Sequence, residues 1–379
     1  MIDRVGISCT GCGSCEARCP FGAIGFKTDT NGFTYPHIDV ERCTKCNLCE
    51  RSCPVSNELT TESNDSITTY AAFATEKPSQ SSSGGSFYSI AHAVLSNGGV
   101  VYGAYLTTDL NVIHIRVDNK ESLYKLCGSK YVQSLISPDL YKSIETDLKN
   151  KKQVLFIGTP CQVAGVKLFL RRNYENFYTI DLICHGVPSP IVFSDFINYC
   201  KKLRRHKITG FIFRDNRDGW NNIFKSTIKY EDGIQEYNTG LSNLWNRLFF
   251  SELITRPSCH ECRFATTQRV GDLTLGDFWG IKNVPVAIHN KGVSLILCNT
   301  PKGRELLSVS PLTLIESKTN RTEHPNLYNP TPMNPDKADF QDYYNANGFS
   351  KAVKRYFGFS KWLDFKLRLY SILSKIRQK

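Results

Sequence analysis

Two cysteine runs with the same spacing dominate the first 53 residues. Each run reads C-x2-C-x2-C-x3-C-P, the first over residues 9–20 and the second over residues 43–54. Three closely spaced thiolates suit one 4Fe–4S cube, and the fourth cysteine of each run reaches the other cube. The spacing therefore predicts two clusters with crossed ligands: Cys9, Cys12, Cys15 and Cys53 for one, and Cys43, Cys46, Cys49 and Cys19 for the other.

The double run is the one that bacterial-type ferredoxins use. Structural zinc sites also take four cysteines, but they typically present two separated C-x2-C pairs, so we favour clusters. Apolar residues alternate between the two runs, from Phe21 to Val40, and this pattern predicts a short hairpin packed against the cubes. Because such clusters move single electrons and make no bonds, we expect any catalytic centre to lie downstream.

Composition sets the class of protein and its compartment. The chain has 379 residues, which allows two or three domains, and its 41% hydrophobic and 22% charged residues rule out wholesale disorder. No apolar run is long enough to cross a bilayer, and the N-terminus lacks the apolar core of a signal peptide. We therefore expect a cytoplasmic protein. In that reducing compartment its 15 cysteines indicate metal or cluster ligands before disulfides.

The rest of the chain is expected to form an α/β body with a mixed sheet and flanking helices, after an α+β ferredoxin-like module. Expected strands cover residues 70–74, 100–106, 112–117, 154–158, 178–184, 210–214, 224–230 and 293–299, and expected helices cover 86–95, 163–171 and 191–203. Apolar runs that alternate with helical patterns indicate this layering. The expected domains are the module at 1–58, a polar linker at 59–69, a body at 70–345 (parts about 70–150 and 151–345), and a C-terminal helix at 346–379.

Four body cysteines form a candidate third cluster set. Cys161 and Cys184 each follow an expected strand, where open α/β sheets build their sites, and Cys259 and Cys262 form a C-x2-C pair. Four such thiols can hold a further 4Fe–4S cluster, although Cys161 and Cys184 taken singly could be core thiols. The remaining three cysteines lie in apolar surroundings and are expected to be small buried hydrophobic residues: Cys127, Cys200 and Cys298.

A serine- and glycine-rich stretch at residues 79–86 leads directly into the expected helix 86–95. Backbone N–H groups at a helix start suit a phosphate or the edge of a flavin ring. A flexible loop with an N-cap serine is the simpler alternative. The chain contains neither G-x-G-x-x-G nor G-x4-G-K-[ST], so the sequence supports neither a Rossmann nicotinamide site nor a P-loop.

Seven short motifs follow one another along the body. They are Ser83-Gly84-Gly85, Gly128-Ser129-Lys130-Tyr131-Val132-Gln133-Ser134, Gly158-Thr159-Pro160-Cys161-Gln162, Cys184-His185-Gly186, Phe213-Arg214-Asp215, the Cys259/Cys262 pair, and Thr274-Leu275-Gly276-Asp277-Phe278-Trp279-Gly280. In order and spacing the chain resembles the beta-subunit family of coenzyme F-420 hydrogenases and dehydrogenases, from about residue 70 to about residue 320. Some members carry the same fused ferredoxin module. One departure is Asn216, where the family usually has lysine after Phe-Arg-Asp.

The resemblance implies a flavin-dependent oxidoreductase, because members bind FAD beside a 4Fe–4S cluster and pass electrons between clusters and an organic acceptor. It implies that Cys161, Cys184, Cys259 and Cys262 hold the body cluster. It further implies that two segments line the flavin, through Ser83, Gly84, Gly85, Gly128, Ser129, Lys130 and Tyr131, with Lys130 near its negative charge. Some relatives are encoded among genes for surface-polysaccharide synthesis, which implies a role in that metabolism. No catalytic residue is assigned.

The C-terminal segment is strongly basic. Residues 351–379 carry nine Lys/Arg and one acid, which is +8 of the formal net charge of +12. Apolar residues recur there on one face of a helix: Trp362, Phe365, Leu369, Ile372 or Leu373, and Ile376. This pattern predicts contact with an anionic membrane surface at its inner face or, equally, docking on the body. Nucleic acid is disfavoured as a partner because the charge is confined to the tail.

Two functions follow from these observations. The first is an enzyme, an iron–sulfur flavoprotein reductase that takes electrons from a redox donor, such as a ferredoxin or a partner enzyme, and delivers them to an organic acceptor. The second is a non-catalytic electron-transfer subunit that docks on a separate redox enzyme. A bound flavin with an open substrate pocket favours the first function.

Overall fold

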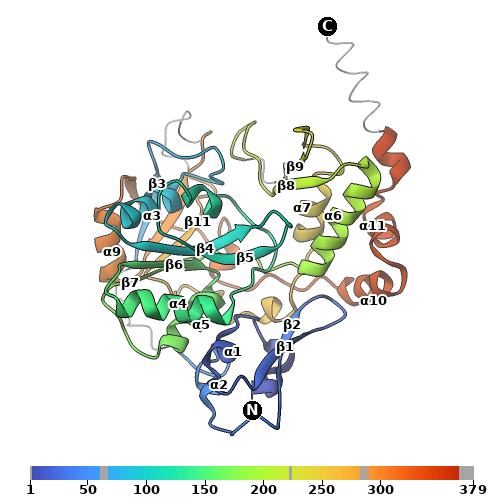
Figure 1. The fold of residues 1–379 in the computed structure, drawn as a ribbon. Coiled ribbons are helices and arrows are strands. Elements are labelled where there is room, and N and C mark those ends of the chain that lie inside the picture. Colours follow the sequence, from blue (N-terminus) through green and yellow to red (C-terminus); the bar gives the residue numbers. More distant parts are fainter. Residues whose placement is uncertain (1, 60–66, 222–223, 282–287, 289, 367–379) are drawn as a thin grey trace.

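The chain folds into three adjoining parts, an N-terminal module, a large central sheet with helices, and a smaller helical part (Figure 1). The computed structural model describes residues 2–59, 67–221, 224–281, 288 and 290–366. The predicted linker at 59–69 therefore lies largely outside the described residues, and the body begins at strand β3 (Thr68–Phe73).

The N-terminal module is small and is built around a hairpin. It comprises η1 (Ile2–Ser8), α1 (Ser14–Arg18), β1 (Ile24–Thr28), β2 (Thr34–Ile38) and α2 (Leu48–Arg51). Strands β1 and β2 pair antiparallel, as the alternating residues between the cysteine runs predict. The core of the module includes Ile24 and Ile38 together with the side chains of Cys15 and Cys53.

The central sheet has eight strands in the order β13-β3-β12-β11-β7-β6-β4-β5. Besides β3, they are β4 (Val100–Leu106), β5 (Val112–Val117), β6 (Val154–Gly158), β7 (Phe177–Leu182), β11 (Leu273–Asp277), β12 (Ser294–Cys298) and β13 (Thr313–Ser317). The four central neighbours β4, β6, β7 and β11 run parallel, and antiparallel strands flank them on both sides. The predicted mixed sheet is confirmed.

Helices cover both faces of the central sheet (Figure 1). One face packs on α3 (Ser86–Ser96) and α9 (Pro301–Ser308), and the other on α4 (Pro138–Lys149) and α5 (Pro160–Leu170). Helix α5 begins with a capping box between Thr159 and Gln162, followed by proline at its first position, so its sequence fixes where it starts. The N-terminal module contacts α4 and α5 through α1.

The third part joins a three-stranded sheet, in the order β10-β9-β8, to several helices. Its elements are β8 (Ile208–Ile212), β9 (Thr227–Tyr230), β10 (Gln235–Tyr237), α6 (Pro190–Arg204), α7 (Leu244–Phe250), α10 (Lys337–Asn347) and α11 (Phe349–Phe357). They share an apolar core that contains Phe196, Trp245 and Phe349. The described chain also contains three further short 3-10 helices: η2 (Leu123–Leu126), η3 (Pro257–Glu261) and η4 (Pro325–Leu327).

The C-terminal segment first docks on the body and then leaves it. Helix α11 buries Phe349 and Val353 in the core of the third part. A further helical stretch covers residues 361–366, where Trp362 and Phe365 are 68% and 64% exposed. The rest of the predicted amphipathic face, Leu369, Ile372, Leu373 and Ile376, lies outside the described residues. No helix in the ranges described above is both long and apolar enough to span a membrane.

Candidate functional site

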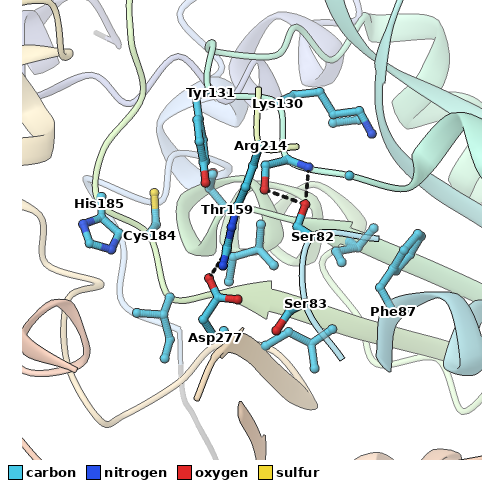
Figure 2. A pocket seen from close by; sticks show the side chains of 18 of the residues that line it. Ser82, Ser83, Phe87, Lys130, Tyr131, Thr159, Cys184, His185, Arg214 and Asp277 are labelled. Carbon is cyan, nitrogen blue, oxygen red and sulfur yellow. Dashed lines mark hydrogen bonds and ion pairs between the residues drawn. The ribbon is translucent and has the colours of Figure 1, made fainter. Parts of the chain in front are cut away.

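A cavity of about 410 Å³ lies at the carboxyl ends of the parallel strands β6, β7 and β11. Ligands of open α/β sheets bind at this edge, because the loops that follow the strands converge there. The cavity is lined by stretches within 81–88, 126–134, 157–162, 182–188, 275–279 and 323–326, with Arg214, Phe249 and Phe250. Figure 2 shows ten of these residues labelled around its centre.

The serine-rich loop before α3 forms one wall of this cavity. The Ser82 hydroxyl oxygen accepts hydrogen bonds from the Ser129 backbone N–H at 2.7 Å and the Ser129 hydroxyl at 2.8 Å. The Ser83 hydroxyl donates to the Val293 carbonyl at 2.9 Å. The two segments that were predicted to line a flavin are therefore tied together although they are far apart in sequence.

Six of the seven predicted flavin residues line the cavity: Ser83, Gly85, Gly128, Ser129, Lys130 and Tyr131. Gly84 packs against the sheet instead, since a Cβ atom there would lie 2.4 Å from the Ala72 carbonyl oxygen. Gly85 precedes α3 with φ of +85°, a left-handed conformation that glycine adopts at low cost. The glycines thus let the backbone turn at the cavity wall.

Lys130 lines the cavity, but its ammonium group bonds to backbone. Nζ donates to the carbonyl oxygens of Leu126 at 2.9 Å and Cys127 at 2.8 Å. Burial lowers the pKa of Lys130 to about 8. Figure 2 shows its side chain extending away from Asp277. Its predicted role beside a flavin stays a prediction.

Arg214 and Asp277 form an ion pair across the cavity wall, and neither was predicted as a site residue. The Arg214 Nη1 atom lies 2.5 Å from Asp277 Oδ2, and Nη2 donates to the Trp220 carbonyl at 2.9 Å. The guanidinium also stacks 5.2 Å from the centroid of the Trp279 ring. Both residues belong to motifs identified in the sequence, and this was the signal that could have indicated them. Their contact with each other depends on the fold.

Three buried polar atoms at the cavity have no hydrogen-bond partner among the described residues: Arg214 Nε, Ser86 Oγ and His324 Nε2. Buried donors are normally paired, so unpaired ones at a cavity indicate a group that binds there. Ser86 begins α3, where the free backbone N–H groups also attract anions. The wall is therefore suited to a ligand with anionic or carbonyl oxygens.

The four body cysteines come together beside the cavity. Cys161 follows β6 at the start of α5, Cys184 follows β7, and Cys259 and Cys262 come from η3 and the residue after it. Burial, together with a smaller effect of nearby cysteines of the set, raises the pKa of the Cys161 thiol to about 11 and that of Cys259 to about 12. Burial likewise raises the pKa of Cys184, with contributions from the other three thiols.

Cys184 links this cysteine set to the cavity. It follows β7 and lines the cavity together with His185, Gly186 and Val187 (Figure 2). Cys259 also approaches this loop, since a Cβ atom on Gly186 would lie 3.3 Å from the Cys259 Cβ atom. Any cluster held by these thiols would share a wall with whatever fills the cavity.

The N-terminal cysteines lie in two neighbouring groups. Burial raises the pKa of Cys15, and the nearby Cys12, Cys9 and Cys53 raise it further. The other four surround a second small cavity of about 20 Å³: Cys19, Cys43, Cys46 and Cys49. We call these groups the inner and outer sets, because Cys46 is exposed whereas Cys9, Cys12, Cys15 and Cys53 are buried.

The inner set lies against the body cysteines. Cys12 and Cys161 are near enough for each charge to affect the other. Gly165 on α5 permits this approach, since a Cβ atom there would lie 3.0 Å from the Cys12 sulfur. The three sets therefore follow one another from the surface of the module to the cavity.

Across the described ranges, no three His, Cys, Asp or Glu side chains are grouped as ligands of one metal ion. Cys200 and Cys298 are buried, as predicted, and Cys127 is buried although it also touches the cavity.

Two families match parts of the chain. Residues 151–318 match the family described as the C terminus of the beta subunit of coenzyme F420 hydrogenase/dehydrogenase. Residues 8–57 match the 4Fe-4S dicluster domain. The segment 151–318 belongs to this beta-subunit family. The chain is thus an iron–sulfur protein of an oxidoreductase family, with a dicluster domain ahead of its beta-subunit segment.

Solved structures also resemble the chain. One is the F420-reducing [NiFe] hydrogenase complex from Methanosarcina barkeri, in a xenon derivative, at a TM-score of 0.45 and 15% identity over 66% of this chain and 81% of that chain. No curated protein matches the sequence. The beta-subunit match begins at Lys151, so it includes all four body cysteines, Arg214 and Asp277.

Proposed function

We propose that the chain is an iron–sulfur flavoprotein oxidoreductase that passes electrons from its N-terminal domain to an organic acceptor. The observation that carries the proposal is the position of Cys184, which belongs to the body cysteine set and lines the 410 Å³ cavity. A cluster ligand in the wall of a ligand cavity is the arrangement that short-range electron transfer needs. The acceptor would bind where the cavity opens.

The cofactors would supply the chemistry: clusters exchange single electrons, and a flavin exchanges electrons singly or in pairs. The inner and outer sets would each hold one 4Fe–4S cluster, and Cys161, Cys184, Cys259 and Cys262 a third. FAD would lie between the serine-rich loop and residues 128–131. The unpaired Ser86 Oγ and Arg214 Nε support this placement, because both can donate hydrogen bonds to oxygens of such a ligand.

The order of the three cysteine sets supports a path for electrons from the outer set to the cavity. The exposed Cys46 places the outer set where a redox donor, a ferredoxin or a partner enzyme, can approach it. The inner set follows, and then the body cysteines. Proposed domain limits fit this order: a dicluster domain at 1–58, a linker at 59–69, a reductase body at 70–345 and a tail from 346.

We also propose that the tail lies on an anionic membrane surface at its inner face. Trp362 and Phe365 are exposed although both are large and apolar. Asp364, between them, is buried and pairs with Arg204 at 2.5 Å, which fixes this turn on the body. The basic residues of the tail add electrostatic attraction. An acceptor in surface-polysaccharide metabolism would be met at such a surface.

Anaerobic reconstitution tests the main proposal. The protein is supplied with iron, sulfide and FAD, and its iron and flavin contents are measured after gel filtration. We expect bound FAD whose absorbance bleaches when electrons are supplied to the clusters. Protein with full iron that binds neither FAD nor FMN would leave non-catalytic electron transfer to a separate enzyme as the function.

A further inference from the structure

A buried guanidinium without an acidic partner lies at the junction of the module and the body. Arg256 has 0% exposure, and its side-chain hydrogen bonds to the described residues go to neutral acceptors. Nε donates to the Cys9 carbonyl at 2.6 Å, Nη2 to the Thr34 carbonyl at 2.7 Å, and Nη1 to the Gln133 side-chain oxygen at 3.0 Å. Among the described residues no carboxylate pairs with it. A buried charge of this kind is costly unless opposite charge lies nearby.

The aromatic residues of the module complete this enclosure. The Arg256 guanidinium lies 4.6 Å from the centroid of the Tyr35 ring and 5.4 Å from that of Phe33. Gly11 leaves room for it, since a Cβ atom there would lie 3.0 Å from Nη1. The module and the body thus close over one cation from both sides.

The cysteines near Arg256 come from two different sets. The Arg256 guanidinium donates to the backbone carbonyl of Cys9. The Arg256 carbonyl accepts a hydrogen bond from the Cys259 N–H at 3.0 Å. The guanidinium is also near enough to Cys161 for its charge to act on that thiol. Cys9 belongs to the inner set and the other two to the body set. The guanidinium therefore acts on both at once.

We infer that Arg256 is a positioning residue that sets the reduction potentials of the inner and body clusters together. The inference rests on the proposed body cluster. A 4Fe–4S cube with four thiolates is negatively charged and gains one further negative charge on reduction. A buried cation stabilises the more negative form, and net charge is one of the determinants of cluster potential. Because Arg256 raises both potentials together, the difference between them, which drives electron transfer from one cluster to the other, stays small.

The step served is a single electron transfer. With both clusters bound, one electron would pass from the inner cluster, which would be oxidised, to the body cluster, which would be reduced by the same electron. No bond forms or breaks, and no proton moves. Arg256 keeps its charge throughout, so it favours whichever of the two clusters holds the electron.

The test is an anaerobic redox titration of the full chain followed by electron paramagnetic resonance. Arg256→Met removes the charge, and Gln133→Glu places a carboxylate where the Gln133 oxygen now meets Arg256. We expect either change to lower the potentials of the inner and body clusters by about 59 mV or more, which is a tenfold change in the equilibrium constant of a one-electron reduction. The outer cluster should not move. Gln133→Met removes the hydrogen bond and keeps the charge, so all three potentials should stay near wild type.

Unchanged potentials in a Gln133→Glu protein with full iron would overturn the inference, and this nearly isosteric variant decides the matter where Arg256→Met does not fold. An equal fall in Gln133→Met would overturn it too, because packing would then be the cause. Wild-type protein with only two clusters would refute the proposed body cluster. In that case the inference about both clusters also fails, whereas three clusters with unchanged potentials in Gln133→Glu would refute the inference alone.

Discussion

The Asn216 side-chain amide donates a hydrogen bond to the Ser82 backbone carbonyl at 2.8 Å. Ser82 in turn accepts from Ser129 through its hydroxyl oxygen. Three segments of the cavity wall therefore meet at one serine. Asn216 occupies the position where the related family usually has lysine, so this chain holds the serine-rich loop with an amide.

Replacing Asn216 with alanine should weaken FAD binding and leave the iron content unchanged. The change removes one hydrogen bond that fixes the loop, worth roughly 1 kcal/mol, or about fivefold in affinity. Flavin fluorescence titration measures the effect. Asn347→Ala is the control, because that side chain bonds within α10, to Tyr343. Equal FAD affinities in the two variants would contradict the assignment of the serine-rich loop to the flavin site.

Gly85→Val should abolish flavin binding with full retention of iron. Valine is strained at φ of +85°, and its Cβ atom would lie 2.7 Å from the Lys77 Cβ atom. Gly98→Val is a matched control at the other end of α3, with φ of +73° and no atom within 4 Å of its Cβ position. The flavin content after gel filtration separates the two. Loss of flavin in both would point to backbone strain alone.

Cys259→Ser should remove about four of roughly twelve iron atoms and leave the N-terminal clusters intact. Serine is a poor replacement for a thiolate ligand, so the body cluster would be lost. Cys200→Ser, a buried thiol on α6, should keep full iron. Iron and sulfide analysis of anaerobically purified protein measures the cluster content of both variants. An undiminished iron content in the first variant would remove Cys259 from the ligand set.

Local sequence patterns predicted the parts of the fold that depend on local chemistry. The strands at 100–106, 112–117 and 154–158 have the predicted bounds, because each is an apolar run that ends at turn residues. Strand β11 was missed as a strand, since Gly276 and Asp277 interrupt its apolar pattern, yet it lies mid-sheet between β7 and β12. Helices α4 and α7 and the edge strands β10 and β13 were also missed.

At the candidate site too, local sequence patterns predict some features, whereas contacts between distant residues depend on the fold. Cysteine spacing predicts the two ligand sets of the module, and this assignment stays a prediction. The ion pair of Arg214 with Asp277 joins residues 63 apart in sequence, and Arg256 meets Cys9 across 247 residues. No local pattern reports such contacts, because they depend on how separate elements pack.

His114 should make the protein less stable in mild acid. Its Nε2 donates to the Ile157 carbonyl at 3.1 Å and its Nδ1 accepts from Ser134 at 3.0 Å, so the neutral ring is fully paired. Burial lowers its pKa to about 4, below the unfolded value of about 6.5. Its contribution is complete above about pH 6.5 and declines as the pH falls toward 4, because the unfolded chain then binds the proton more readily.

The expected loss between pH 7 and pH 5 is about 2 kcal/mol in the free energy of unfolding. His114→Gln should flatten this part of the pH profile, measured by denaturant unfolding at matched iron content. A variant with the same slope as the wild type would assign the acid sensitivity to other groups.

Removing residues 367–379 should abolish binding to anionic vesicles without unfolding the body. The segment carries Arg368, Lys375, Arg377 and Lys379 and no acid, so its attraction to anionic lipid should also weaken in high salt. A cut before α11 would instead destabilise the body, because it removes the buried Phe349 and Val353. Vesicle flotation at low salt is the measurement. Full-length protein that does not float there favours docking on the body.

The core of the N-terminal module has a consequence for how the protein is made. Cysteines recur in that core beside a few aliphatic side chains, among them Cys15 and Cys53. A segment this short buries little apolar surface, and metal binding can then supply much of its folding free energy. The larger body has apolar cores of its own. A cell starved of iron would therefore accumulate chains with a folded body and an unfolded, protease-sensitive module.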